Sequence, residues 1–246
     1  MPEPAVTYRV ADRIAIITLN RPDKRNAINE DLATSLRAAW ERFNAGDELV
    51  AVMTHTGDDF CVGVDVKAPA SDFPACVPNV GVQLRKPLVA AVSGWVVGGA
   101  VVMVQMADLC VAASNTRFTF PEAKVGFTGA LIAGLAARIP HKVAMELMLL
   151  GEEVSAQRAY EVGMVNKVVP PAQVIDAAMQ YATRLASNAP LVLELLKEFV
   201  TEVLPKGPSE HVAHGRLAIQ RVRQSADARE GVASFKEKRK PGFKGK

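Results

Sequence analysis

Several features that mark common protein classes are scarce or absent in this sequence. The net charge of its 246 residues is only +3, whereas a dedicated nucleic-acid-binding protein carries a clear basic excess. No apolar run reaches the roughly twenty residues that a membrane-spanning helix needs. No basic segment followed by an apolar one opens the chain. We therefore expect a soluble, cytoplasmic protein that binds neither nucleic acid nor a membrane.

Cysteine and histidine are also few, and their spacing matches no metal or disulfide pattern. The three cysteines, Cys61, Cys76 and Cys110, form no CxxC pair, and Cys61 and Cys110 lie in apolar runs typical of reduced core residues. The four histidines form neither HExxH nor a mixed cysteine–histidine site. The sequence also has no GxSxG elbow, phosphate-binding loop or dinucleotide fingerprint. We expect no metal and no redox cofactor.

The chain is rich in apolar residues, which can form a large core. Its residues are 49% hydrophobic and 22% charged, which excludes global disorder. Apolar, mostly β-branched runs alternate with helical patterns over the first two thirds, which predicts an α/β fold with a largely parallel sheet. The predicted strands are a hairpin over residues 5–19, with a turn at Ala11–Asp12 before the second strand at 14–19, and then 49–54, 88–92, 109–113 and 165–169.

Helices are predicted from capping residues and periodicity. Asn29 can cap a helix over residues 30–43, and Ser155 a short one over 156–161. Further helices are expected at 131–138 and 143–150, with a short one before Arg85. The last third is helical throughout, at 171–186, 190–203, 208–224 and 226–236.

Residues 87–130 hold the main candidate for chemistry. Gly98 and Gly99 can open a helix whose free N–H groups another molecule approaches closely. Glu122 is a lone acid among aromatic, apolar and small residues, which makes it a candidate for a raised pKa and for proton transfer. This pattern predicts an oxyanion hole beside a carboxylate, suited to a carbonyl compound. Alternatively, the glycines only permit close packing and Glu122 caps a helix.

Eight segments in order resemble the crotonase superfamily, the enoyl-CoA hydratase/isomerase proteins, over essentially the whole chain. The resemblance implies a spiral of ββα units over residues 1–190 with an acyl-CoA site. It also implies a C-terminal helical trimerisation region over residues 191–246, and assembly as a homotrimer or a dimer of trimers. The matching segments are residues 17–27, 60–65, 86–94, 98–99, 107–108, 120–122, 163–166 and 235–241.

The resemblance also implies roles for individual residues. The thioester carbonyl would lie between the backbone N–H groups of Val64 and Gly99. Ala27 and Val62 match adenine-binding positions, while Phe235 and Lys238 match positions that reach the adenine and phosphate of a neighbouring subunit. Coenzyme A is part of the substrate, and no separate cofactor is implied. From local chemistry, we expect Asp65 to brace its loop and Asp108 to be a satisfied buried polar residue.

The sequence departs from the family's pattern at several positions. The hydratases' second glutamate would fall at Val102, which can neither hold nor deprotonate water. The glycine triplet ends in Ala100, and Gly129-Ala130 stands where Pro-Gly is more usual. The shortened, proline-rich loop 68–86 should reshape the acyl pocket, for which the candidate lining residues are Trp95, Phe127 and Phe73.

These departures favour 3,2-enoyl-CoA isomerisation, with Glu122 as the single acid and base. Enoyl-CoA hydration, hydrolysis or decarboxylation remain alternatives, for which Glu152 or Glu153 could replace the missing carboxylate. A second class of function is a non-catalytic relative that binds acyl-CoA, or binds RNA through Arg221–Arg223 and Lys236–Lys246. The small net charge and the lack of interleaved aromatic residues argue against RNA.

Overall fold

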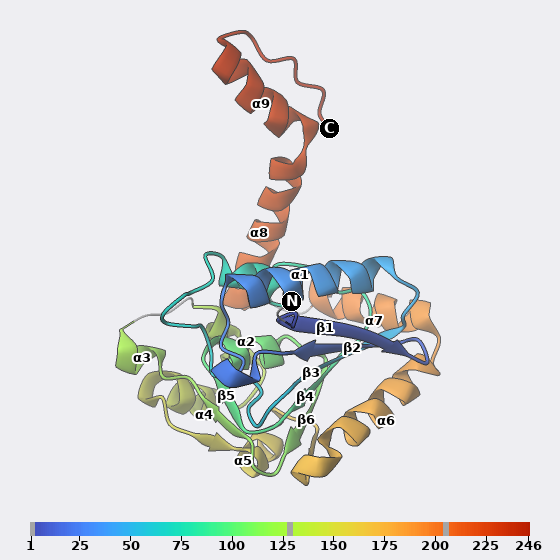
Figure 1. Ribbon diagram of the computed structural model, residues 1–246, viewed down its shortest axis with the longest axis vertical. Coiled ribbons are helices and arrows are strands. Elements are labelled where there is room, and N and C mark those ends of the chain that lie inside the picture. The colour runs from blue at the N-terminus through green and yellow to red at the C-terminus, as the bar shows by residue number, and fades with distance from the viewer. Residues whose placement is uncertain (1–2, 127–129, 204–206) are drawn as a thin grey trace.

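A six-stranded sheet forms the centre of the molecule (Figure 1). The computed structural model describes residues 3–126, 130–203 and 207–246. The first two strands form an antiparallel hairpin, and every other neighbouring pair in this sheet is parallel, as the sequence predicts. In spatial order the strands are β1 (Val6–Ala11), β2 (Ile14–Leu19), β3 (Val50–His55), β4 (Leu88–Val92), β6 (Leu109–Ala113) and β9 (Lys167–Val169).

Side chains that alternate along each strand build a core on both faces of this sheet. On β3, Val50 and Val52 pack towards α6 (Val174–Ala186), whereas Ala51 and Met53 belong to the larger core on the opposite face. That larger core is covered by α1 (Glu30–Ala45) and includes residues 100–104 of the fully buried helix α2 (Gly99–Gln105). Burial on both faces explains the continuous apolar runs that the sequence shows.

Two predicted helix caps are present. The Asn29 side chain accepts a hydrogen bond from the Leu32 backbone N–H at 3.0 Å, at the start of α1. The Ser155 hydroxyl accepts one from the Arg158 N–H at 3.2 Å, at the start of α5 (Ala156–Glu161). Each cap satisfies a backbone donor that the first helical turn leaves without a partner.

A second, three-stranded sheet was not predicted. It consists of β5 (Trp95–Val97), β7 (Arg117–Thr119) and β8 (Val154–Ser155). Strands of two or three residues are too short to show an alternating pattern, so the sequence gives no signal for them. This sheet carries part of the candidate site described below.

Three helix predictions were wrong in type. Residues Leu131–Ala137 form a 3₁₀ helix, in which Gly134 is unfavourable for an α-helix. The predicted helix at 143–150 is split between α4 (His141–Met145) and a π-helical turn, Glu146–Leu150. Instead of a helix just before Arg85, the loop carries a 3₁₀ turn at Phe73–Cys76, because Pro74 and Pro78 interrupt longer helices.

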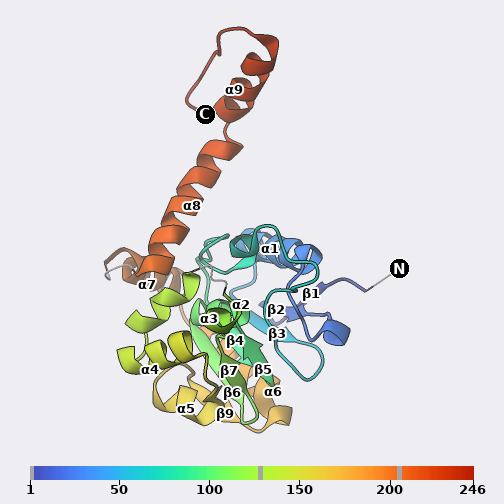
Figure 2. The same cartoon turned by 90° about the vertical axis from the view of Figure 1, so that its left-hand side faces the viewer.

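The C-terminal helices follow the predicted bounds closely: α7 (Pro190–Val203), α8 (Pro208–Gln224) and α9 (Ala226–Glu237). Lys197 fastens α7 to the core, because its Nζ donates to the Lys86 carbonyl at 2.8 Å and lies 2.6 Å from an Asp108 carboxylate oxygen. Beyond its first turns α8 leaves the core, and α9 lies far from the sheet in both views (Figures 1 and 2). Among the described residues, no helix is long and apolar enough to cross a membrane.

Candidate active site

The segment 61–64 runs parallel to β5 and continues past its end. Cys61 pairs with Val96: the Cys61 N–H donates to the Trp95 carbonyl and the Val97 N–H donates to the Cys61 carbonyl, both at 3.0 Å. Val64 follows Cys61 by three residues and Gly99 follows Val96 by three, so both residues come just after this paired stretch, at the same end of it. The approach is close at Gly63, where an added Cβ would lie 3.0 Å from the Val97 carbonyl oxygen and where φ is +89°.

On its other side β5 pairs in parallel with β7, which leads to Glu122. Val97 is paired with Thr119, and the Gly98 N–H donates to the Thr119 carbonyl at 2.9 Å. Glu122 begins the short helix α3 (Glu122–Val125) directly after this strand and is half-buried. Three consecutive parallel segments therefore end at one edge and bring Val64, Gly99 and Glu122 to the same region.

The backbone N–H groups of Val64 and Gly99, which the sequence resemblance singles out, are available at this edge. The Asp65 N–H donates to the Ile28 carbonyl at 2.9 Å, and the Val101 N–H donates to the Gly98 carbonyl at 3.0 Å. Within the described residues, the N–H groups of Val64 and Gly99 donate to no protein acceptor. Gly99 is the first residue of α2, where an N–H has no intrahelical partner. These are the two backbone donors that the sequence resemblance assigns to an oxyanion hole.

Val102 lies one turn into α2 and is 2% exposed within the larger core. Neither of the two alternative carboxylates, Glu152 and Glu153, replaces the glutamate that is missing at position 102. Glu152 and Glu153 are both exposed, and a Glu152 oxygen lies 3.8 Å from the Lys124 ammonium at the surface. Glu122 is therefore the acid that the strand pairing brings to this edge.

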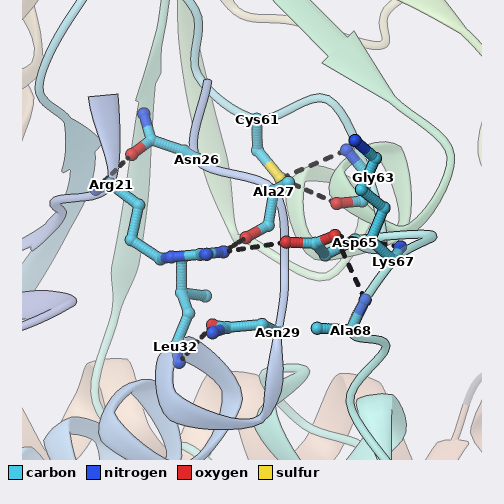
Figure 3. Close-up of polar contacts among 10 residues, drawn as sticks. All are labelled: Arg21, Asn26, Ala27, Asn29, Leu32, Cys61, Gly63, Asp65, Lys67 and Ala68. Atoms are coloured by element: carbon cyan, nitrogen blue, oxygen red, sulfur yellow. Dashed lines mark hydrogen bonds and ion pairs between the residues drawn. The ribbon is translucent and has the colours of Figure 1, made fainter. Parts of the chain in front are cut away.

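The loop before α1 lies against segment 61–64, so Ala27 and Val62 come together as expected. The Val62 N–H donates to the Arg25 carbonyl at 3.2 Å, and the Ile28 N–H to the Gly63 carbonyl at 2.8 Å. Figure 3 shows Ala27 in this arrangement, with its carbonyl accepting from the Arg21 guanidinium. These contacts position the backbone that resembles an adenine-binding element.

Fully buried Asn26 holds this loop in shape. Its side-chain oxygen accepts from the Arg21 N–H at 2.8 Å, and its amide nitrogen donates to the Thr56 and Asp59 carbonyls at 2.9 Å each. A left-handed backbone at Asn26, with φ of +55°, directs the side chain inwards. Asn26 stands inside a segment that the sequence matched to the family, but this bracing role was missed.

Asp65 braces its own loop, as predicted (Figure 3). One oxygen accepts from the N–H groups of Lys67 at 3.1 Å and Ala68 at 3.3 Å, and the other lies 3.5 Å from the Arg21 guanidinium. These backbone hydrogen bonds lower the Asp65 pKa below its usual value. Asp108 is satisfied by the Leu88 N–H at 2.7 Å and by Lys197, but it is exposed rather than buried, because it lies at the surface under α7.

All three cysteines are buried free thiols in the described structure. Burial raises the pKa of Cys61, Cys76 and Cys110 to about 12 in each case. A thiol with such a pKa is protonated at neutral pH and is a poor nucleophile. The cysteines at 61 and 110 are therefore core residues, as their apolar surroundings predict.

Comparison with known proteins identifies the family. The enoyl-CoA hydratase/isomerase family pattern matches residues 9–246. The chain is 34% identical to (E)-benzylidenesuccinyl-CoA hydratase of Thauera aromatica, over 98% of this chain and 99% of that protein. It is 32% identical to 2,3-dehydroadipyl-CoA hydratase of Escherichia coli K12, over 95% and 96%. The chain belongs to the enoyl-CoA hydratase/isomerase family.

Solved structures of this family share the fold. Enoyl-CoA hydratase from Mycobacterium tuberculosis H37Rv matches with a TM-score of 0.76 and 35% identity, covering 99% of this chain and 100% of that one. Carnitinyl-CoA hydratase from Mycobacterium avium matches with a TM-score of 0.77 and 30% identity over the full length of both. The predicted α/β crotonase-like fold is therefore confirmed, and the chain is a crotonase-family enzyme that acts on acyl-CoA thioesters.

Two residues expected at the CoA site of this family lie elsewhere in the single chain. Phe235, 86% exposed, is on α9 and Lys238 directly follows that helix, and α9 lies far from α2, the helix that Gly99 begins (Figure 2). Phe127 and Gly129 lie outside the described residues, as do the side chains of Arg221 and Arg223. Within the described ranges, no group of three or more histidine, cysteine, aspartate or glutamate side chains could hold a metal ion.

Proposed function

We propose that this enzyme moves the double bond of an enoyl-CoA from the 3 to the 2 position. The observation that carries the proposal is the combination at one edge of two available N–H groups, one carboxylate at Glu122 and a buried valine at position 102. In the family's hydratases, as implied by the sequence resemblance, a second glutamate would occupy the Val102 position.

The reaction needs only one group that carries a proton. The Glu122 carboxylate removes a proton from the α-carbon, and the electron pair delocalises onto the thioester oxygen to give a dienolate. The N–H groups of Val64 and Gly99 donate to that oxygen, and each such donor contributes about 3 kcal/mol to the transition state. Glu122 then returns the proton to the γ-carbon. No atom is gained or lost, so no water and no second acid are required.

Val102 suits this reaction better than water addition. An apolar side chain offers water no hydrogen bond, and burying a polar molecule against it is unfavourable. Loss of one acid–base group typically lowers a rate by about a hundred- to ten-thousand-fold. Hydration by Glu122 alone would therefore be slow, whereas proton transfer within one acyl group would not be affected.

Hydration is the second candidate, because the relatives compared above are named as hydratases. A paired assay on the purified protein separates the two. A 3-enoyl-CoA reports double-bond migration, and a 2-enoyl-CoA reports water addition. We expect efficient migration with little hydration. Efficient hydration without migration would overturn the isomerase proposal and show that another group activates water.

We also propose that the enzyme assembles as a homotrimer or a dimer of trimers. Helix α7 carries a row of exposed apolar side chains that includes Leu195, Phe199 and Val203, each about 60% exposed. Contiguous apolar surface of this kind is typical of protein–protein interfaces. Assembly would also allow Phe235 and Lys238 to reach the CoA of a neighbouring subunit.

Light scattering should report three or six protomers for the wild type. Phe199→Asp places a charge on the exposed apolar row and should shift the protein to a lower mass, with a higher KM for acyl-CoA. Glu202→Gln, on the same helix, is the matched surface control and should change neither value. A monomeric wild type with normal turnover would contradict the assembly proposal.

A further inference from the structure

The ring of Phe73 lies directly against Gly99. A Cβ added at Gly99 would meet the Cζ, Cε2 and Cε1 atoms of Phe73 at 2.7, 3.0 and 3.2 Å. The three distances are nearly equal, so the outer half of the ring presents its face, rather than its edge, to the glycine. Phe73 is half-buried and packs on the larger core. A side chain at position 99 would displace this ring from its place.

The position of the ring limits the space around the thioester. A Cβ in a helix leans towards the helix N-terminus, and the N–H of a first helical residue points the same way. The ring therefore borders the space in front of the Gly99 N–H, where the carbonyl oxygen of a bound acyl group would lie. The α-carbon is bonded to that carbonyl carbon, so a substituent on it would lie within reach of the ring.

The loop around Phe73 is held at several points. On its N-terminal side, the Ser71 N–H donates to a Glu30 carboxylate oxygen at 2.7 Å. On its C-terminal side, the Cys76 thiol lies 3.2 Å from the Phe73 carbonyl, and the indole N–H of Trp40 donates to the Cys76 carbonyl at 2.9 Å. The ring is thus supported from α1 and from within its own turn.

One support comes from the C-terminal helices. Arg216 on α8 donates from one guanidinium nitrogen to both Asp72 carboxylate oxygens, at 2.8 and 2.6 Å. Asp72 is the residue immediately before Phe73 and precedes the 3₁₀ turn that carries it. The ion pair is partly shielded, since the Arg216 side chain is 33% exposed. It links α8 to the residue that borders the oxyanion hole.

We propose that Phe73 is a specificity-determining residue that excludes acyl groups branched at the α-carbon, and that Arg216 is a positioning residue that keeps the ring in place. The inference rests on the proposed role of the Gly99 N–H and narrows the substrate class to straight-chain acyl-CoA thioesters. On this proposal a methyl group on the α-carbon meets the ring. A branch at the β-carbon lies one bond further away and should be tolerated better.

Binding of two isomeric, unreactive thioesters tests the proposal without relying on turnover. Butanoyl-CoA and 2-methylpropanoyl-CoA have the same atoms and differ only in the α-branch. Calorimetry should give a Kd for the branched isomer that is higher by about tenfold or more in the wild type. Phe73→Ala should bring the two values close together, and Phe73→Leu, which keeps an apolar side chain on the loop, should give an intermediate ratio.

Arg216→Ala should lower the discrimination between the isomers without abolishing binding of butanoyl-CoA, and Arg216→Lys should restore part of it. Arg158→Ala removes a comparable surface ion pair with Glu161, far from loop 68–86, and should leave the ratio unchanged. Equal affinity of the wild type for both isomers, or an unchanged ratio in the folded Phe73 variants, would overturn the proposal.

The binding test and the function test fail separately. Discrimination between the isomers in a protein that does not shift double bonds would leave the Phe73 inference standing and remove the isomerase proposal. Double-bond migration without discrimination between the isomers would leave the isomerase proposal standing and remove the Phe73 inference. Absence of binding to either thioester would overturn the role of Phe73, because no acyl group would then reach Gly99.

Discussion

Glu122→Gln should lower the rate of double-bond migration by about a hundred- to ten-thousand-fold. The amide has the size of the carboxylate but cannot accept the α-proton. Because the two backbone donors and the adenine-binding backbone are untouched, the affinity for a saturated acyl-CoA should stay close to that of the wild type. The measurement is kcat with a 3-enoyl-CoA together with the Kd of butanoyl-CoA.

The matched control is Glu152→Gln. This glutamate lies near α3, where it pairs with Lys124, but its side chain is 62% exposed. The same chemical change there should leave kcat within about twofold of wild type, since exposed ion pairs contribute little. A Glu122→Gln enzyme that kept its activity would show that a different group moves the proton.

Trp40→Ala should reduce the free energy of unfolding by about 3–5 kcal/mol. The fully buried Trp40 side chain projects from α1 into the larger core, and its indole N–H donates to the Cys76 carbonyl of the loop that carries Phe73. Alanine leaves a cavity in the larger core and removes that hydrogen bond. Denaturant unfolding of the two proteins measures the difference, and a loss below about 1 kcal/mol would contradict the packing described here.

Trp40→Phe separates the two contributions. Phenylalanine retains most of the apolar contact but cannot donate, so the buried carbonyl loses its partner at a cost of about 1–3 kcal/mol. We expect its stability to lie between wild type and Trp40→Ala. Since the loop loses the same support in both variants, both should also show weaker discrimination between the branched and straight thioesters.

The central sheet was predictable because its strands are buried on both faces. The runs at 88–92 and 109–113 are apolar without interruption, the run at 14–19 is apolar except for Thr18, and the structure has strands with those same bounds. Capping at Asn29 and Ser155 was equally clear, because a short polar side chain directly before an amphipathic segment is typical of a helix N-cap. These elements are specified by residues close together in the chain.

The elements that failed to show in the sequence depend on contacts between distant segments. β5, β7 and β8 are strands only because they pair with one another. The π-helical turn ends at Gly151, whose carbonyl accepts from Thr119 and Lys124. Neither hydrogen bond changes the local hydrophobic periodicity, so the sequence predicted a continuous helix over residues 143–150, which was wrong.

For the site, the sequence identified the participants but not all of their neighbours. Val64, Gly99 and Glu122 were named from motifs, and the parallel pairing brings their segments to one edge. Phe73 was only one of three aromatic candidates for the pocket, because loop length does not determine where a ring points. Its contact with Gly99 comes from the bonds that Glu30, Trp40 and Arg216 make to the loop.

Because segment 61–64 runs parallel to β5, the proposed site depends more on the number of residues in these two segments than on their side chains. Both proposed donors are main-chain groups, so many substitutions at Val64 would leave the N–H where it is. Deleting one residue between Cys61 and Val64 would instead turn the next N–H to the opposite side of the segment. Variation in this enzyme should therefore accumulate through exchanges of residues at this edge, while the spacing from Cys61 to Val64 and from Val96 to Gly99 stays fixed.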